Sequence, residues 1–482
     1  MLFTRSLFLR GLGFVYLAAF LSLEWQVSGL LGADGLRPVG SFLERAAASF
    51  EGVDVLRLPT VFWLGSGDLA LRAACWIGAA LSLLVIGGML PLASLIGCWA
   101  LYLSFVGVGA PFLTYQWDAL LLETGFLAIF WAPTTTRLAS PLASPPSSIV
   151  RALLMWLLFR LMFFSGWVKL ASGDPTWWDL SALEYHYETQ PLPTWTAWYM
   201  AQLPAWFQKL SAAGTLFIEL VAPFFLLLGP RARAITAIAF VGLQVFIGAT
   251  GNYGFFNLLS ALLCVPLLDD DRLLALVPHR LRSWVSQTSL RASPSRFVLH
   301  AGIAFLLLLL TVAASVGQLT GMRAFVEPVA PLARLVQPFH LTSRYGLFAV
   351  MTTRRPEVRV EGSRDGVNWT PYVFRWKPGP LSRRPSFVEP DMPRLDWQMW
   401  FDGLRIERAV QTGQRAFGAV TPSLVAKLES GSPAVLALLG PDPFPGEPPR
   451  FVRWQLFDYE FTDGPERAET GDWWKRQLLY PK

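Results

Sequence analysis

Nine apolar stretches of the chain are long enough, or nearly long enough, to cross a membrane as helices. A helix needs about 20 apolar residues to span the hydrocarbon core. Two of the stretches are short: Trp117–Trp131, which carries Asp118 and Glu123, and Phe255–Leu268, which could be re-entrant. The sequence therefore predicts an α-helical polytopic membrane bundle of seven to nine transmembrane helices. The nine predicted spans are Leu7–Leu23, Leu69–Gly88, Leu92–Gly109, Trp117–Trp131, Ala152–Leu170, Leu210–Leu228, Ala232–Gly248, Phe255–Leu268 and Val298–Val316.

The last third of the chain has a different composition. Only 15% of the 482 residues are charged, against about 25% in soluble domains. Residues 320–482 nevertheless hold 22 of the 40 Lys and Arg and 18 of the 34 Asp and Glu. We therefore expect a polytopic transmembrane domain over residues 1–319 and a polar domain over residues 320–482.

The charge and cysteine patterns exclude some classes of protein. Basic residues do not cluster among aromatic ones, so the sequence gives no support for nucleic-acid binding. The three cysteines lie in apolar stretches and form no Cys-x-x-Cys pair, which argues against a disulfide framework or a structural zinc site. The sequence indicates no cofactor and no metal.

The orientation of the spans follows from the Lys and Arg of the short loops. Leu7–Leu23 lacks a small-x-small cleavage site behind it, so we expect an uncleaved first span with Arg5 on the cytoplasmic side. The basic loops Thr134–Arg151 and Asp269–Arg296 then fall on the same side, and Ser172–Gln208 falls on the other. Nine spans would place the C-terminal domain outside the cytoplasm.

Charged side chains inside the predicted spans need partners, because each costs about 2.5–3.5 kcal/mol on insertion scales. Asp118 lies near a helix start, whereas Glu123, Arg160 and Glu219 lie deeper. The structural interpretation pairs Arg160 with Glu123 or Glu219 inside the bundle. The alternative is a polar cavity that serves a ligand or a substrate segment.

The densest cluster of functional groups runs from Lys169 to Pro193. Asp174 precedes a proline and begins a short helix, and the rings that follow, Trp177 among them, suit the membrane interface. His186 has acidic neighbours in sequence, Glu188 among them, so it could take part in acid–base chemistry. The other interpretation is a re-entrant interfacial segment without chemistry. The candidate functional cluster comprises Asp118, Glu123, Arg160, Lys169, Asp174, Trp177, His186, Glu188 and Glu219.

The polar domain reads as strands with one or two helices. Glu357–Glu361 alternates with a period of two, and an Asp-Gly turn at Asp365 separates it from a second aromatic strand. Phe451–Thr462 predicts another strand, while Pro393–Leu404 and Pro422–Leu439 predict helices. We expect a β-rich domain, a small sandwich, outside the membrane.

Several segments of the chain together resemble the lipase maturation factor family. The resemblance runs nearly end to end, and its motifs are long. They are Gln116–Asp118, Glu123–Leu127, Ser172–Trp177, Tyr185–Pro193, Gly251–Tyr253, Arg344–Thr353, Glu361–Ser363, Pro393–Phe401 and Trp473–Trp474.

The resemblance implies a protein of the endoplasmic reticulum membrane that helps secreted lipases to fold and assemble, and it implies no catalytic residues. Its expected partners are secreted client proteins and membrane lipids. The composition favours a bacterial member, which would lie in the inner membrane with its C-terminal domain in the periplasm. Two alternatives stay open at this point: a polytopic membrane enzyme centred on His186, distantly similar to vitamin K-dependent carboxylases, and a transporter.

Overall fold

The computed structural model describes residues 1–140, 143–276, 294–414 and 418–481. Seven of the described helical segments are long and apolar enough to cross a membrane, which lies within the predicted range of seven to nine. We therefore treat the chain as a multi-pass membrane protein. The seven are α1 (Leu2–Leu31), α3 (Asp68–Gly87), α4 (Pro91–Val108), α6 (Ser148–Ala171), α10 (Ala205–Leu220) continued by η2 (Ala222–Leu227), α11 (Pro230–Thr250) and α14 (Pro294–Thr320).

Two of the nine predicted spans form helices that are shorter than the other seven. Trp117–Trp131 forms α5 (Gln116–Trp131), whose 16 residues extend about 24 Å against a hydrocarbon core of about 30 Å. Phe255–Leu268 is broken into α12 (Phe256–Leu262) and the 3₁₀ turn η3 (Val265–Leu267). The apolar side chains of α5 are buried against protein, so its hydrophobicity reflects a position inside the bundle.

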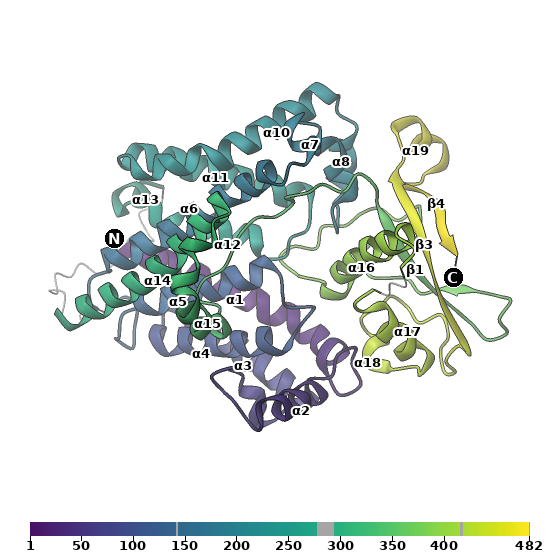
Figure 1. Cartoon of the computed structure of the whole chain (residues 1–482), viewed down its shortest axis with the longest axis horizontal. Coiled ribbons are helices and arrows are strands. Elements are labelled where there is room, and N and C mark those ends of the chain that lie inside the picture. The colour runs from purple at the N-terminus through teal and green to yellow at the C-terminus, as the bar shows by residue number, and fades with distance from the viewer. Residues whose placement is uncertain (141–142, 277–293, 415–417, 482) are drawn as a thin grey trace.

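The first helix, α1, runs through the middle of the helical bundle (Figure 1). Most of its large side chains are buried, including Phe8, Tyr16 and Phe20, whereas Leu7, Phe14 and Leu21 form one exposed stripe. Close approach to α3 depends on glycine: a Cβ on Gly78 would lie 2.5 Å from the ring of Phe20. Helix α1 is apolar all round, and its buried faces contribute to the core of this bundle.

The C-terminal region contains one antiparallel sheet of four strands in the order β2-β1-β3-β4. The register pairs Val358 with Leu456 and Val360 with Trp454. The predicted hairpin is confirmed: β1 turns through Asp365 and pairs with β2. The strands are β1 (Pro356–Ser363), β2 (Thr370–Pro371), β3 (Phe451–Phe461) and β4 (Trp474–Pro481).

The expected small sandwich is wrong for the described residues, which form a single sheet covered by helices. The even-numbered side chains of β1, Val358 and Val360, are fully buried on the helix side. Helix α16 (Arg394–Gln411) approaches so closely that a Cβ on Gly403 would lie 2.2 Å from the carbonyl oxygen of Pro356. The predicted helical segments Pro393–Leu404 and Pro422–Leu439 are confirmed as α16, α17 and α18. Bounds are α17 (Thr421–Glu429) and α18 (Pro433–Leu436).

Short elements connect these parts, and the sheet lies at one end of the helical bundle (Figure 1). Most of the basic loop Asp269–Arg296 lies outside the described residues. The short elements are α2 (Val39–Phe50), η1 (Val61–Leu64), α7 (Pro175–Trp178), α8 (Ala182–Thr189), α9 (Trp195–Ala201), α13 (Asp270–Leu276), η5 (Arg323–Phe325), η6 (Glu327–Val329), α15 (Ala330–Val336), η7 (Gln337–Phe339) and α19 (Gly464–Thr470).

Candidate functional site

In the described part of the chain, three separate ion pairs hold buried charges of the helical bundle. The first joins Arg160 of α6 to Glu123 of α5, and both side chains are about 5% exposed. The Tyr345 hydroxyl donates a hydrogen bond to the other oxygen of Glu123 at 2.7 Å, and Arg160 donates to the carbonyl of Ser343 at 3.1 Å. The predicted pairing of Arg160 with Glu123 is thus confirmed, and it also holds the segment that follows α15.

The second ion pair joins Lys169 near the end of α6 to Glu219 of α10. The Lys169 ammonium contacts both oxygens of Glu219, at 2.9 and 2.7 Å, and lies 5.2 Å from the ring centre of Trp177. Both charged side chains are buried. Glu219 therefore forms its ion pair with Lys169 and not with Arg160.

The third ion pair joins the bundle to the C-terminal region. Arg394, the first residue of α16, donates to both oxygens of Asp118 at 2.8 and 3.1 Å. It also donates to the hydroxyl of Tyr102 and the carbonyl of Phe112. Arg394 and Asp118 are 0–1% exposed, so their charges compensate each other away from water.

The segment between α6 and α9 docks onto the chain that leads into the sheet. Asp174 accepts a hydrogen bond from the Thr176 amide at the start of α7, and a second from the Met351 amide at 2.6 Å. The Trp177 indole donates to the carbonyl of Phe348 at 2.9 Å. Two residues of the predicted cluster are therefore positioning groups for this junction.

His186 of α8 contacts no carboxylate among the described residues. Its Nε2 lies 3.2 Å from the hydroxyl of Tyr253, which donates to Gln190 at 2.8 Å, and the ring meets the edge of Phe348. Burial and the nearby Lys169 charge lower the pKa of His186 to about 4. The imidazole is neutral at physiological pH, and the expected acid–base pairing with a neighbouring carboxylate is not formed.

Glu188 is used elsewhere: it accepts a hydrogen bond from the Phe461 amide of β3 at 2.6 Å. Burial raises its pKa to about 7 from the usual 4.5. The unfolded chain ionises this group at lower pH than the folded chain does, so the free energy of unfolding falls as pH rises from about 4.5 to 7.

We expect Glu188→Gln to remove the fall in the free energy of unfolding that accompanies rising pH. The variant keeps an acceptor for the Phe461 amide and gains about 2–3 kcal/mol relative to the wild type between pH 5 and pH 8. Thermal unfolding in detergent at the two pH values measures the difference. Equal pH slopes for both proteins would contradict the raised pKa.

A cavity of about 90 Å³ lies where α6, α8, α10 and α11 meet. It brings together four residues of the predicted cluster: Lys169, Trp177, His186 and Glu219. Arg160 instead lines a different cavity, of about 270 Å³, beside α14. The nine predicted residues therefore do not form one site.

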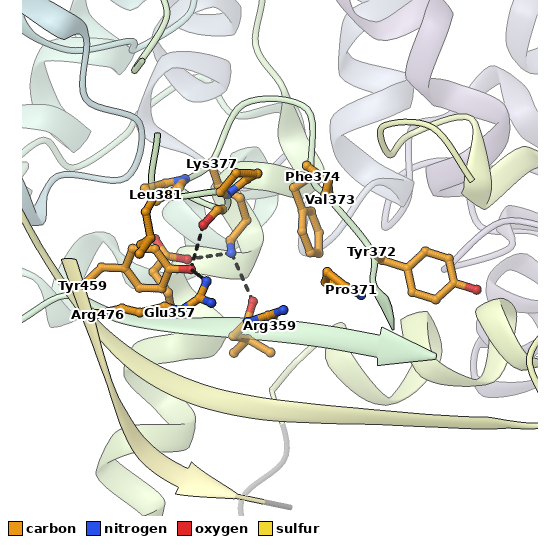
Figure 2. Close-up of a pocket in the computed structure, with 14 residues that line it drawn as sticks. Glu357, Arg359, Pro371, Tyr372, Val373, Phe374, Lys377, Leu381, Tyr459 and Arg476 are labelled. Atoms are coloured by element: carbon orange, nitrogen blue, oxygen red, sulfur yellow. Dashed lines mark hydrogen bonds and ion pairs between the residues drawn. The ribbon is translucent and has the colours of Figure 1, made fainter. Parts of the chain in front are cut away.

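A pocket of about 240 Å³ is lined by residues of β1, β3 and β4 and by the chain that follows β2 (Figure 2). Glu357 at its base is buried between Lys377, 2.7 Å away, and Arg355, 2.8 Å away. Arg359 and Arg476 project from β1 and β4 on the same side. Two buried cations hold Glu357, and two further cations lie at the sheet surface, so the net charge of the pocket is positive.

Known proteins match nearly the whole length of the chain. Residues 3–275 match the lipase maturation factor transmembrane domain, and residues 341–481 match the lipase maturation factor C-terminal domain. The chain belongs to the lipase maturation factor family. Lipase maturation factor 2 of Gallus gallus is 34% identical over 98% of this chain and 80% of its own length. Lipase maturation factor 1 of Bos taurus is 33% identical over 99% of this chain and 88% of its own length.

No solved structure matches the chain. Similarity to lipase maturation factors over nearly the full length supports the role of a membrane maturation factor, and it does not favour the polytopic enzyme centred on His186. The bacterial origin inferred from composition is not supported by these comparisons, because the relatives above are vertebrate proteins.

Sequence reasoning missed the residues that join the two regions of this family member. Arg394 and Tyr345 lie inside the family motifs but were assigned no partner, and Arg355 was not singled out. The balance of charges could have revealed such a partner. Asp118 lies in an apolar stretch and requires a cation, but the centres of the apolar stretches offer too few cations. That deficit indicates a partner from the polar C-terminal region.

Proposed function

We propose that this protein binds secreted lipases through its C-terminal region and assists their folding and assembly in the endoplasmic reticulum membrane. The relatives over the full length are named for lipase maturation, which supports a lipase as the client. The basic loops favour placing the C-terminal region on the lumenal side, where a secreted client would be met.

The observation that carries the proposal is the pocket lined by β1, β3 and β4. Arg359 of β1, with 24% of its side chain exposed, lines this pocket. Arg476 of β4 stacks over the ring of Phe457 with 5.1 Å to its centre. Arginine and aromatic rings are the groups enriched where proteins recognise partners.

The charge of the pocket specifies the kind of segment that it accepts. Arg359 and Arg476 lie at the sheet surface, and the carboxylate of Glu357 is already held by Arg355 and Lys377. Arg359 lies 3.1 Å from Glu361, which also pairs with Arg453, and Arg476 donates to the hydroxyl of Tyr459. An acidic side chain of the client would supply a further carboxylate to these guanidinium groups. We therefore expect the recognised client segment to be acidic and accessible before the client has folded.

Replacing Arg359 and Arg476 together with glutamine is expected to reduce lipase maturation at least threefold, because the variant removes both surface charges of the pocket. The experiment expresses a secreted lipase with this chain in cells that lack their own maturation factors. Lipase activity is measured per amount of secreted lipase. Immunoblotting of the membrane fraction shows whether the variant accumulates like the wild type.

The matched control is Arg408→Gln, an exposed arginine on α16 that does not line the pocket. It should leave lipase maturation unchanged. Full maturation by the Arg359/Arg476 variant would refute binding through this pocket. Point variants are preferable to removal of residues 320–482, since the truncation also leaves Asp118 without Arg394.

A further inference from the structure

The cavity beside His186 contains two buried polar groups that no other part of the described chain satisfies. The Tyr187 hydroxyl and the Gln244 side-chain oxygen have no hydrogen-bond partner among the described residues. Their residues are 1% and 5% exposed, and both line the cavity. Buried polar groups in native proteins are nearly always paired with protein, water or a ligand, so this donor and this acceptor are available to a polar molecule that enters the cavity.

The size of the cavity limits what can enter it. One water needs about 10–15 Å³ of such volume, so about 90 Å³ admits a head group of roughly six to nine heavy atoms. A glycerol moiety is of that size. A whole lipid would have to leave its chains outside the cavity.

The charge of the cavity excludes an ionic ligand. Lys169 and Glu219 neutralise each other through two short contacts. His186 adds no charge at physiological pH, because burial lowers its pKa to about 4. The other polar residues that line the cavity, Tyr187, Gln244 and Thr215 among them, are neutral, and a phosphate or an ionised carboxylate would find no free cation here.

The walls of the cavity lead to the membrane. Their apolar part includes Leu161 of α6 and Leu243 and Ile247 of α11. Phe246, on the same rim, is 37% exposed, and only 28% of the apolar stretch of α11 is buried inside the protein. The ligand can therefore enter from the bilayer while its chains stay in the hydrocarbon.

We propose that this cavity binds the head group of a neutral lipid that carries a free hydroxyl, of the diacylglycerol class. The lipid hydroxyl donates to the Gln244 oxygen and accepts from the Tyr187 hydroxyl. Its acyl chains lie along α11 beyond Phe246. Binding of this lipid is a property beyond the assistance given to a client, and it can be measured with no client present.

The test uses the full-length chain in phosphatidylcholine nanodiscs with a diacylglycerol probe that carries a photoreactive acyl chain. Mass spectrometry locates the crosslinks, which we expect on α11 near Phe246. Unlabelled 1,2-dioleoylglycerol should compete, whereas dioleoyl phosphatidic acid, which differs by its charged head, should not. Crosslinks elsewhere on the protein, or equal competition by both lipids, would overturn the proposal.

Tyr187→Phe and Gln244→Leu each remove one of the two hydrogen bonds and should weaken competition by dioleoylglycerol at least fivefold. Tyr187→Phe removes a hydroxyl that is unpaired in the lipid-free protein, so its melting temperature without lipid should not fall. Tyr185→Phe, on the same helix but outside the cavity lining, is the matched control and should bind like the wild type. Unchanged binding in both cavity variants would also overturn the proposal.

Discussion

Arg394→Met is expected to destabilise the folded protein by about 3–5 kcal/mol. Removing one partner of a buried ion pair leaves the other charge without compensation. Asp118 would keep only the hydroxyl of Tyr102 and the amide at its own helix start. Since whole proteins are stable by about 5–15 kcal/mol, the variant should accumulate poorly in the membrane.

Thermal unfolding of the purified protein in detergent measures this effect. The double variant Asp118→Leu with Arg394→Met removes both charges and should recover much of the lost stability, because an apolar pair can replace a buried ion pair. Arg408→Met, on the exposed side of the same helix, controls for the loss of a positive charge. An Arg394→Met variant that melts at the wild-type temperature would show that the ion pair between Asp118 and Arg394 does not stabilise the folded protein.

Arg355→Met should produce a loss of similar size, about 3–5 kcal/mol, at the junction between the sheet and α8. The Arg355 guanidinium is fully buried and donates to the carbonyl groups of three residues that end or follow α8, Glu188, Gln190 and Pro191. It also compensates one oxygen of Glu357. The substitution leaves three carbonyl groups and a carboxylate without this donor.

The neighbouring residue supplies a matched control for this prediction. Arg354 lies next to Arg355, but 49% of its side chain is exposed, and it pairs with Asp458 at 2.8 Å. Arg354→Met should lower the free energy of unfolding by less than about 1 kcal/mol, as for other surface ion pairs. Equal destabilisation by the two variants would contradict the role given to the Arg355 contacts.

Features of the fold that depend on nearby residues could be predicted from the sequence. The long membrane helices follow from continuous apolar stretches, and the β1–β2 hairpin follows from alternation and an Asp-Gly turn. The two short stretches were ambiguous for a physical reason. A helix buried in protein, such as α5, is as apolar as one in contact with lipid.

The candidate site was predictable only in part, because its partners are distant in sequence. Arg160 had two carboxylates to choose from, and the spacing of residues could not assign Glu219 to Lys169. The acid–base alternative at His186 lacks a carboxylate partner for a local reason. Glu184 and Glu188 lie two positions away on the same helix, and side chains at that spacing point to different faces.

The union of α5 with α16 also imposes an order on the biogenesis of the protein. Asp118 is made 276 residues before Arg394, and Ser22 and Gln26 of α1 bond to the Met392 backbone about 370 residues later. Because the ribosome adds about 5–20 residues per second, Arg394 is synthesised about 14–55 s after Asp118. During that interval the nascent bundle holds an uncompensated carboxylate, so it should itself depend on membrane chaperones. A protein that assists the folding of others would thus need assistance during its own folding.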